Sequence, residues 1–180
     1  MNSSKFFHLW KASLLASLLM YVSAAGAVDA DTYNLNRKVI KEANGVTIYN
    51  GGFGSGMARS VSNPELLYFL TDRGPNFNGP ESGQKVFPDL FFSPSVAVYK
   101  FDGTSLEFQR EFKLKDKDGY ELLGLPNPEG LGGTGETPLL LSGQALTNFP
   151  SDGLDSKGIV FLSDDTFWVS DEYGPHIIHF

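Results

Sequence analysis

The sequence predicts an all-β protein built from short antiparallel strands, and three observations support this. Twenty glycines and ten prolines among 180 residues indicate many turns. Aromatic residues make up 13% of the chain and favour strands over helices. Short apolar or alternating segments recur between turn residues, and no amphipathic helix pattern follows the first 27 residues. These features are typical of a sandwich, a barrel or a propeller.

The predicted strands are short and are separated by turn residues: 46–49, 66–71, 95–101, 106–114, 139–141, 158–162, 166–170 and 177–180. The pair 95–101 and 106–114 is the clearest hairpin, because Asp102-Gly103 is a turn sequence and the second arm alternates apolar and polar residues. Residues 76–94 and 115–138 are expected to be loops, since both are rich in glycine and proline.

An internal repeat favours the propeller among these folds. Residues 69–75 and 168–175 both read aromatic, aliphatic, hydroxyl, aspartate and charged residue, and both end in Gly-Pro. The aspartates, Asp72 and Asp171, are 99 positions apart. A propeller blade takes about 40–50 residues, so this spacing suggests two blades. Phe69 and Trp168 are expected in the core.

The first residues predict an exported protein. Lys5 and Lys11 give a positively charged segment before an apolar run over 12–22. Ala25-Gly26-Ala27 then fits a small-residue cleavage site. Residues 1–27 are therefore expected to be a signal peptide and residues 28–45 an N-terminal lead-in. A transmembrane anchor is the alternative, but the run falls short of the ~20 apolar residues that a span needs. We expect a periplasmic or extracellular location.

The charge and the missing cysteines exclude several classes of partner and site. The formal net charge is −7, and loss of the two leader lysines makes the mature chain more acidic still. This argues against nucleic acid or an anionic membrane as a partner. The chain contains no cysteine, so disulfides and thiolate metal sites are excluded. Only two histidines follow the leader, which argues against zinc.

Several motifs follow one another along the chain: Gly52–Gly56, Leu70–Asn76, Val86–Pro88, Gly124–Pro128, Gly132–Thr137, Gly153–Ser156 and Phe167–Pro175. Together they resemble the phytase-like ("esterase-like activity of phytase") family of exported bacterial proteins. The resemblance implies a β-propeller over residues 46–180. The chain after cleavage is long enough for about three four-stranded blades, whereas closed propellers have at least four. We therefore expect a partial, truncated propeller and an N-terminal fragment.

The acidic residues at strand ends and in turns are the candidate site. Asp72, Asp155, Asp171 and Glu172 would repel one another if they converged without a cation, and their oxygens suit Ca²⁺. With bound cations, Arg73 could clamp a phosphate group. We predict Asp72, Arg73, Asp171 and Glu172 as catalytic residues, and a small phosphate ester or ester as the substrate.

One position departs from the family pattern. After Gly153–Ser156 the family has Glu, and this chain has Lys157. An ammonium group cannot ligate a cation, so this change predicts a weakened metal or proton-transfer site if the position serves one. If the position only forms a salt bridge, little changes.

Each candidate residue also has a plainer interpretation. Asp72 and Asp171 could cap turns, and Arg73 and Glu172 could form structural ion pairs. Glu129 and Glu136 could be solvated loop charges, and His176 could be an ordinary strand side chain. The leading hypothesis is metal-assisted hydrolysis of phosphate esters. The alternatives are an esterase or lactonase, or a propeller that binds a ligand or partner without catalysis.

Overall fold

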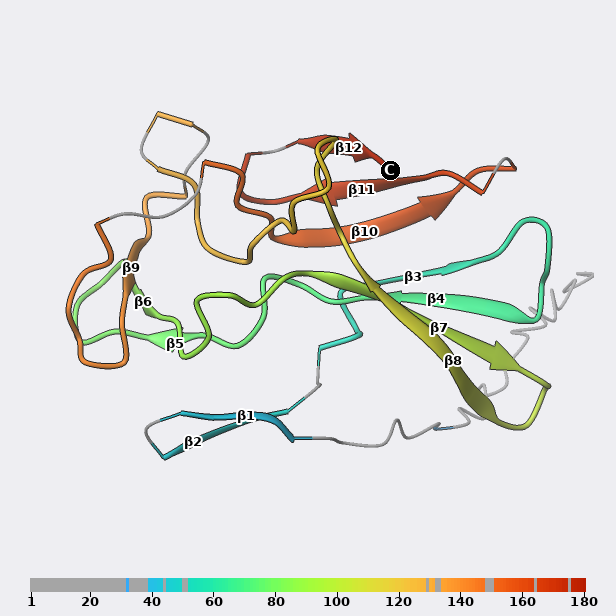
Figure 1. Cartoon of the computed structure of the whole chain (residues 1–180), viewed down its shortest axis with the longest axis horizontal. Coiled ribbons are helices and arrows are strands. Elements are labelled where there is room, and N and C mark those ends of the chain that lie inside the picture. The colour runs from blue at the N-terminus through green and yellow to red at the C-terminus, as the bar shows by residue number, and fades with distance from the viewer. Residues whose placement is uncertain are drawn as a thin grey trace, which may run out of the picture. The chain divides into compact units, whose positions relative to one another are not determined.

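The computed structural model describes residues 32, 39–43, 45–49, 52–128, 130–131, 134–147, 151–163, 165–174 and 176–180. All described strands belong to one unit, Tyr33–Phe180 (Figure 1). Within these ranges the chain forms strands and turns and no helix, which confirms the all-β prediction. No helix capable of crossing a bilayer occurs in the same ranges. The predicted signal peptide, residues 1–27, lies outside them.

The described strands form four sheets. The strands are β1 (Val39–Ala43), β2 (Val46–Tyr49), β3 (Gly56–Arg59), β4 (Leu66–Leu70), β5 (Phe77–Asn78), β6 (Gln84–Val86), β7 (Ser95–Phe101), β8 (Leu106–Lys113), β9 (Thr137–Leu139), β10 (Ser156–Phe161), β11 (Phe167–Asp171) and β12 (Ile177–His179). The largest sheet has the order β3-β4-β7-β8 and is antiparallel throughout. Its β7–β8 pair is the hairpin predicted around Asp102-Gly103.

A second antiparallel sheet, β10-β11-β12, has three described strands, which correspond to the first three strands of the larger sheet. Asp72 follows the second strand of the first sheet, and Asp171 ends the second strand of the second sheet. The two aspartates therefore hold equivalent places, as the sequence repeat predicted. Pro175, the last residue of the repeat, lies outside the described residues.

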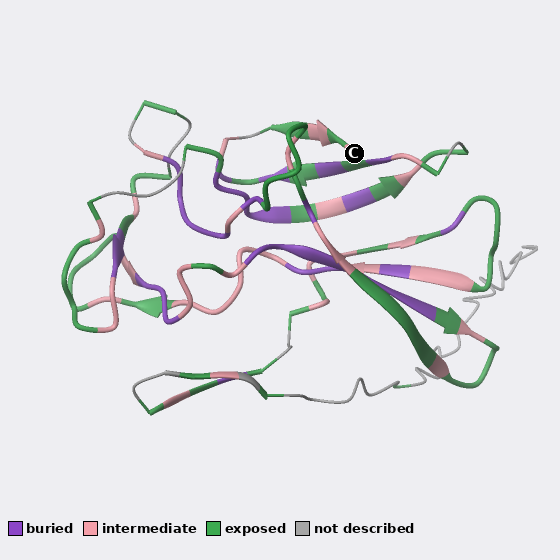
Figure 2. Ribbon diagram, viewed as in Figure 1, coloured by how far each residue is buried: buried purple, intermediate pink, exposed green. Residues whose placement is uncertain are grey.

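The core lies between these two sheets. Tyr68 of β4 packs on Phe161 with ring centroids 3.9 Å apart, and Phe112 of β8 lies 6.1 Å from Phe167. Leu70, Val96, Val98 and Val169 complete the buried centre. Figure 2 shows buried residues along β7 and in β10 and β11, and exposed residues along most of β8. Each sheet thus offers one apolar face to the other.

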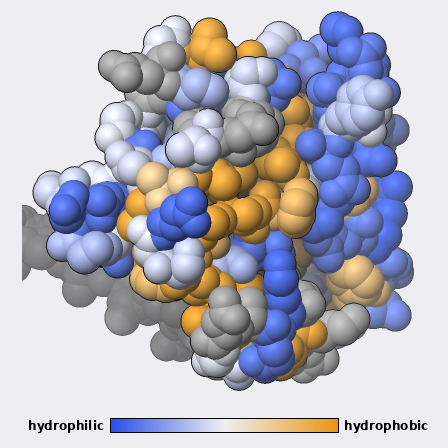
Figure 3. All heavy atoms as spheres, turned by 60° about the vertical axis from the view of Figure 1, so that its left-hand side comes forward, coloured by the Kyte–Doolittle hydropathy of each residue, from blue (hydrophilic) through white to orange (hydrophobic). Residues whose placement is uncertain are grey.

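The outer face of the second sheet is exposed within the described part of the chain. Val160, Trp168 and Ile177 point away from the core on adjacent strands and are exposed. The prediction that Trp168 is a core residue is therefore wrong: it is 40% exposed, and its ring stacks on His179 at 4.5 Å. Figure 3 shows, on the face that it draws, an apolar area between hydrophilic regions.

The segments expected to be unstructured contain short strands. β5 and β6 form within residues 76–94, and β6 pairs in parallel with β9. β9 begins two residues before the predicted strand 139–141. β1 lies in the expected lead-in and pairs with β2. These strands have two to five residues, too few to leave a clear alternation in the sequence.

Candidate functional site

Arg73 lies just after β4, and acidic and aromatic side chains surround it. Its guanidinium donates hydrogen bonds to Glu136 and, over 2.9 Å, to the hydroxyl of Tyr173. Its Nε lies 3.5 Å from Oδ2 of Asp155. Burial alone would lower the pKa of Arg73, but the hydrogen bonds and charges of Glu136 and Tyr173 outweigh burial and raise it. Arg73 therefore stays a cation whose donors are used within the protein.

Gly124 allows the chain to pass directly against Arg73. A Cβ atom at Gly124 would lie 1.8 Å from the carbonyl oxygen of Arg73, so no other residue fits there without a backbone shift. The carbonyl of Gly124 in turn accepts a 3.2 Å hydrogen bond from the Tyr173 hydroxyl. Burial raises the pKa of that hydroxyl, although Arg73 opposes the shift. The Gly124–Pro128 motif thus connects the long loop to both sheets.

Asp155, just before β10, is one of two deeply buried carboxylates among the predicted site residues, and the other is Asp171. The Asp155 side chain is 3% exposed, and its Oδ1 accepts from Lys157 Nζ over 2.8 Å and from the Arg73 backbone N–H over 3.3 Å. Burial raises the pKa of Asp155, with Lys157 and Arg73 opposing the shift. Lys157 also lies 3.2 Å from Glu172, and although burial disfavours the ammonium, these two carboxylates raise its pKa.

Asp171 organises the turn that follows β11. Its carboxylate accepts backbone N–H bonds from Asp155, Tyr173 and Gly174 over 2.9, 3.0 and 3.1 Å. Asp72 makes the simpler version of this turn, accepting from Gly74 N–H over 2.8 Å. Both aspartates therefore cap turns, as the plainer interpretation predicted.

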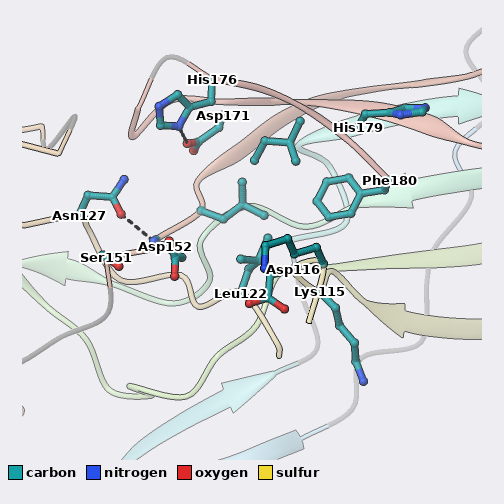
Figure 4. A pocket seen from close by; sticks show the side chains of 14 residues that line it. Lys115, Asp116, Leu122, Asn127, Ser151, Asp152, Asp171, His176, His179 and Phe180 are labelled. Carbon is teal, nitrogen blue, oxygen red and sulfur yellow. Dashed lines mark hydrogen bonds and ion pairs between the residues drawn. The ribbon is translucent and has the colours of Figure 1, made fainter. Parts of the chain in front are cut away.

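A pocket of about 360 Å³ opens beside Asp171 (Figure 4). Its polar lining includes Asp171, His176, Asn127 and two further carboxylates, Asp116 and Asp152. Its apolar lining is made by Leu122, Leu154, Ile178 and Phe180. Lys115 also contributes to the wall, but in Figure 4 its side chain extends away from His176 and Asp171. Lys117 lines the pocket as well, so an apolar wall is combined with a rim of three carboxylates and two ammonium groups.

His176 enters this pocket from the residue before β12. Its Nδ1 lies 3.5 Å from Oδ2 of Asp171, and its side chain is 58% exposed. The ring packs on the backbone of Gly174, where a Cβ atom would lie 1.9 Å from His176 Cε1. Sequence reasoning treated His176 as a strand side chain. Its spacing from Asp171 carried no pattern that would have paired the two residues.

Asn127 forms another side of the pocket. Its side-chain oxygen accepts the Gly153 N–H over 2.6 Å, and this donor fixes which end of the amide is oxygen. The amide NH₂ is then the remaining donor of a side chain that is almost fully buried. Asn127 can therefore offer an N–H group to a molecule in the pocket.

The family follows from a comparison over most of the chain. Residues 48–180 match the family model described as Phytase-like, esterase-like activity of phytase. The chain belongs to this phytase-like family. It is also similar to an uncharacterized secreted protein of Arthroderma benhamiae, with 30% identity over 157 residues. That alignment covers 72% of the chain but only 30% of the relative. No solved structure matches the chain.

The phytase-like chain brings most of the predicted site residues together, in roles that the sequence did not fully assign. Arg73, Asp155, Asp171 and Glu172 belong to one network, joined by Lys157 and by the backbone of Asp155. The Asp72 side chain accepts from Gly74 N–H, and no hydrogen bond or ion pair joins it to this network among the described residues. Glu136 is a partner of Arg73, so the expectation that it is a solvated loop charge is wrong. Glu129 lies outside the described residues.

The arrangement of these carboxylates does not fit a resident calcium ion. No group of three acidic or histidine side chains that could hold a metal occurs in the described part of the chain. The oxygens of Asp155 already face Lys157 and Arg73, and those of Asp171 accept backbone N–H groups. Calcium binding therefore stays a prediction from the sequence, and we derive no chemical step from it.

Proposed function

We propose that this phytase-like protein is an exported hydrolase of small carboxylic esters, with its reaction centre in the pocket beside Asp171. The observation that carries the proposal is the pairing of Asp171 with His176 in a pocket that also has an apolar wall. A carboxylate, an imidazole and an apolar surface are the groups needed to activate water and to hold an ester. The esterase-like activity in the family description agrees with this chemistry.

Charge favours a carboxylic ester over a phosphate ester in this pocket. Its lining holds three carboxylates, those of Asp116, Asp152 and Asp171, against the two ammonium groups of Lys115 and Lys117, and this excess of negative charge disfavours a phosphate dianion relative to a neutral ester. Arg73, which was expected to clamp phosphate, donates to Glu136 and Tyr173 instead. Phosphate ester hydrolysis therefore remains a prediction with less support than carboxylic ester hydrolysis.

Export is part of the proposal. The fungal relative is described as secreted, and residues 1–27 have the pattern of a signal peptide. The chain spans about a third of the length of that relative, so the activity and partners of the whole protein are proposals too. A fusion of residues 1–27 to a reporter enzyme, followed by fractionation, tests export and separates a periplasmic from an extracellular location.

We also propose that the two main sheets are blades of a propeller. Both are antiparallel with their described strands in chain order, four in one and three in the other, and they pack face to face. The apolar residues Val160, Trp168 and Ile177 give the second sheet an exposed face that a further blade would cover. A crystal structure of the longer Arthroderma benhamiae protein tests this. Sheets arranged around a central axis would support the proposal, and a closed two-sheet sandwich would contradict it.

The decisive assay compares two substrates and two neighbouring residues. The purified chain should hydrolyse 4-nitrophenyl butyrate faster than 4-nitrophenyl phosphate. Ile178→Trp should fill the pocket and raise KM, whereas Ile177→Trp, on the opposite face of β12, should not. Circular dichroism of both variants controls for folding. A chain that binds esters without turnover would favour the non-catalytic alternative.

A further inference from the structure

We propose that His176 is the general base of this pocket and that Asp171 orients it. The inference deepens the proposed hydrolase function and rests on it. The two side chains face each other across 3.5 Å, and Figure 4 shows the His176 ring directly over the Asp171 carboxylate. Both belong to the wall of the same pocket, which is large enough for a small ester.

The Asp171 carboxylate is held in a fixed position. Three backbone N–H groups donate to its oxygens, and its side chain is 1% exposed. The Asp171 backbone N–H also donates to the carbonyl of His176 over 2.9 Å, which closes the turn between the two residues. A fixed acceptor beside Nδ1 favours the tautomer with the proton on Nδ1. The lone pair is then on Nε2, the ring nitrogen that Figure 4 draws away from Asp171.

Gly174 makes this orientation possible. The imidazole occupies the space that a side chain at Gly174 would fill, since a Cβ there would lie 1.9 Å from Cε1 and 2.1 Å from Nδ1. The backbone of Gly174 is not in the left-handed region, so alanine could adopt it. Gly174→Ala would therefore displace the His176 ring without removing a functional group from either His176 or Asp171.

The chemical step is hydrolysis with water as the nucleophile. Nε2 of His176 takes a proton from water as the water oxygen bonds to the carbonyl carbon of the ester. The bond from that carbon to the leaving oxygen then breaks, and the imidazolium returns the proton to the leaving alkoxide. One ester and one water give one acid and one alcohol. Nδ1 keeps its proton throughout and faces Asp171.

Chemical rescue gives the sharpest test. His176→Ala should lower kcat on 4-nitrophenyl butyrate by about 10²- to 10⁴-fold with little change in KM. Added imidazole should restore part of the activity, because the side chain is half-exposed and leaves an accessible space. A merely structural role would give no rescue.

Two glycine variants test the orientation of the His176 ring while the His176 side chain itself is kept. Gly174→Ala should lower kcat, whereas Gly54→Ala should not, since Gly54 has open space around it and no left-handed backbone. Long-range ¹H–¹⁵N NMR should show the Nδ1–H tautomer of His176 in the wild type and its loss in Gly174→Ala.

The outcomes distinguish this inference from the function on which it rests. A wild-type chain that hydrolyses neither 4-nitrophenyl substrate would overturn both. An active wild type with an equally active His176→Ala variant would overturn the role of His176 alone, as would the Nε2–H tautomer in the wild type.

Discussion

The ammonium of Lys157 lies 2.8 Å from one oxygen of Asp155 and 3.2 Å from Glu172. It thus stands between two carboxylates, where a bound cation would otherwise neutralise them. The sequence departure that suggested a weakened metal site is, in the structure, an internal counter-ion. Lys157 therefore stabilises the region around Asp155 by pairing with carboxylates of the protein itself.

Removing this counter-ion should destabilise the fold. Lys157→Met leaves the buried Asp155 carboxylate with Arg73 as its remaining cationic partner. Because Lys157 is partly exposed, the expected loss of unfolding free energy is about 1–2 kcal/mol, less than for a fully buried pair. Urea denaturation measures it. Lys117→Met, which breaks an exposed pair with Asp118, should change stability by less than about 0.5 kcal/mol.

Calcium should act on a charge-reversed variant more than on the wild type. Lys157→Glu places a third carboxylate beside Asp155 and Glu172, which should lower the melting temperature in EDTA. Millimolar Ca²⁺ should restore part of that loss, since several carboxylates together suit this ion. The wild type should melt at the same temperature in EDTA and in calcium. A calcium-dependent rise in the wild type would instead support the resident ion that the sequence suggested.

Stability should fall at alkaline pH through Tyr173. Burial raises the pKa of this hydroxyl above its ordinary value of 10.0, so the unfolded chain loses the proton first. The stabilisation is complete below pH 10 and decreases as the pH rises toward the folded-state pKa, by up to about 1.4 kcal/mol per pH unit. Tyr173→Phe should flatten this slope in urea melts between pH 9 and 11. Tyr120→Phe, at an exposed position, should keep the wild-type slope.

Asn127→Asp should separate two roles of one side chain. The new carboxylate can still accept the Gly153 N–H, but it has no NH₂ group to donate into the pocket. If Asn127 stabilises the developing oxyanion, kcat on 4-nitrophenyl butyrate should fall about 10²- to 10³-fold. Asn63→Asp is the matched control outside the pocket, because the Asn63 side-chain oxygen likewise accepts a backbone N–H, that of Glu65, and it should not lower kcat. Unchanged kcat in Asn127→Asp would leave Asn127 with only its structural bond to Gly153.

The strands and turns were predictable because their causes are local. The β7–β8 hairpin follows from Asp102-Gly103 and from the alternation after it, and the turn caps at Asp72 and Asp171 follow from the chemistry of aspartate. The repeat predicted that the two aspartates hold equivalent places because each lies at or just after the end of the second strand of its sheet. In these cases a few neighbouring residues determine the structure.

The partners in the site were not predictable in the same way. Arg73 meets Glu136 and Tyr173 across 63 and 100 positions, so nothing near Arg73 in the sequence identifies them. Trp168 follows the repeat but faces outward, because the repeat fixes the position in the strand and not whether another sheet covers it. His176 reaches Asp171 because its ring occupies the space that a side chain at Gly174 would fill. Tertiary packing decides all three.

The parallel pairing of β6 with β9 also constrains how the chain can change. The excursion between β4 and β7 and the one between β8 and β10 each contribute a strand to the same small sheet. An insertion that moves Gln84–Val86 would deprive Thr137–Leu139 of hydrogen-bond partners, so the two excursions cannot vary in length independently at these anchors. Among homologues, insertions and deletions should therefore fall in the loops outside Gln84–Val86 and Thr137–Leu139. Substitutions within these two paired strands should occur together.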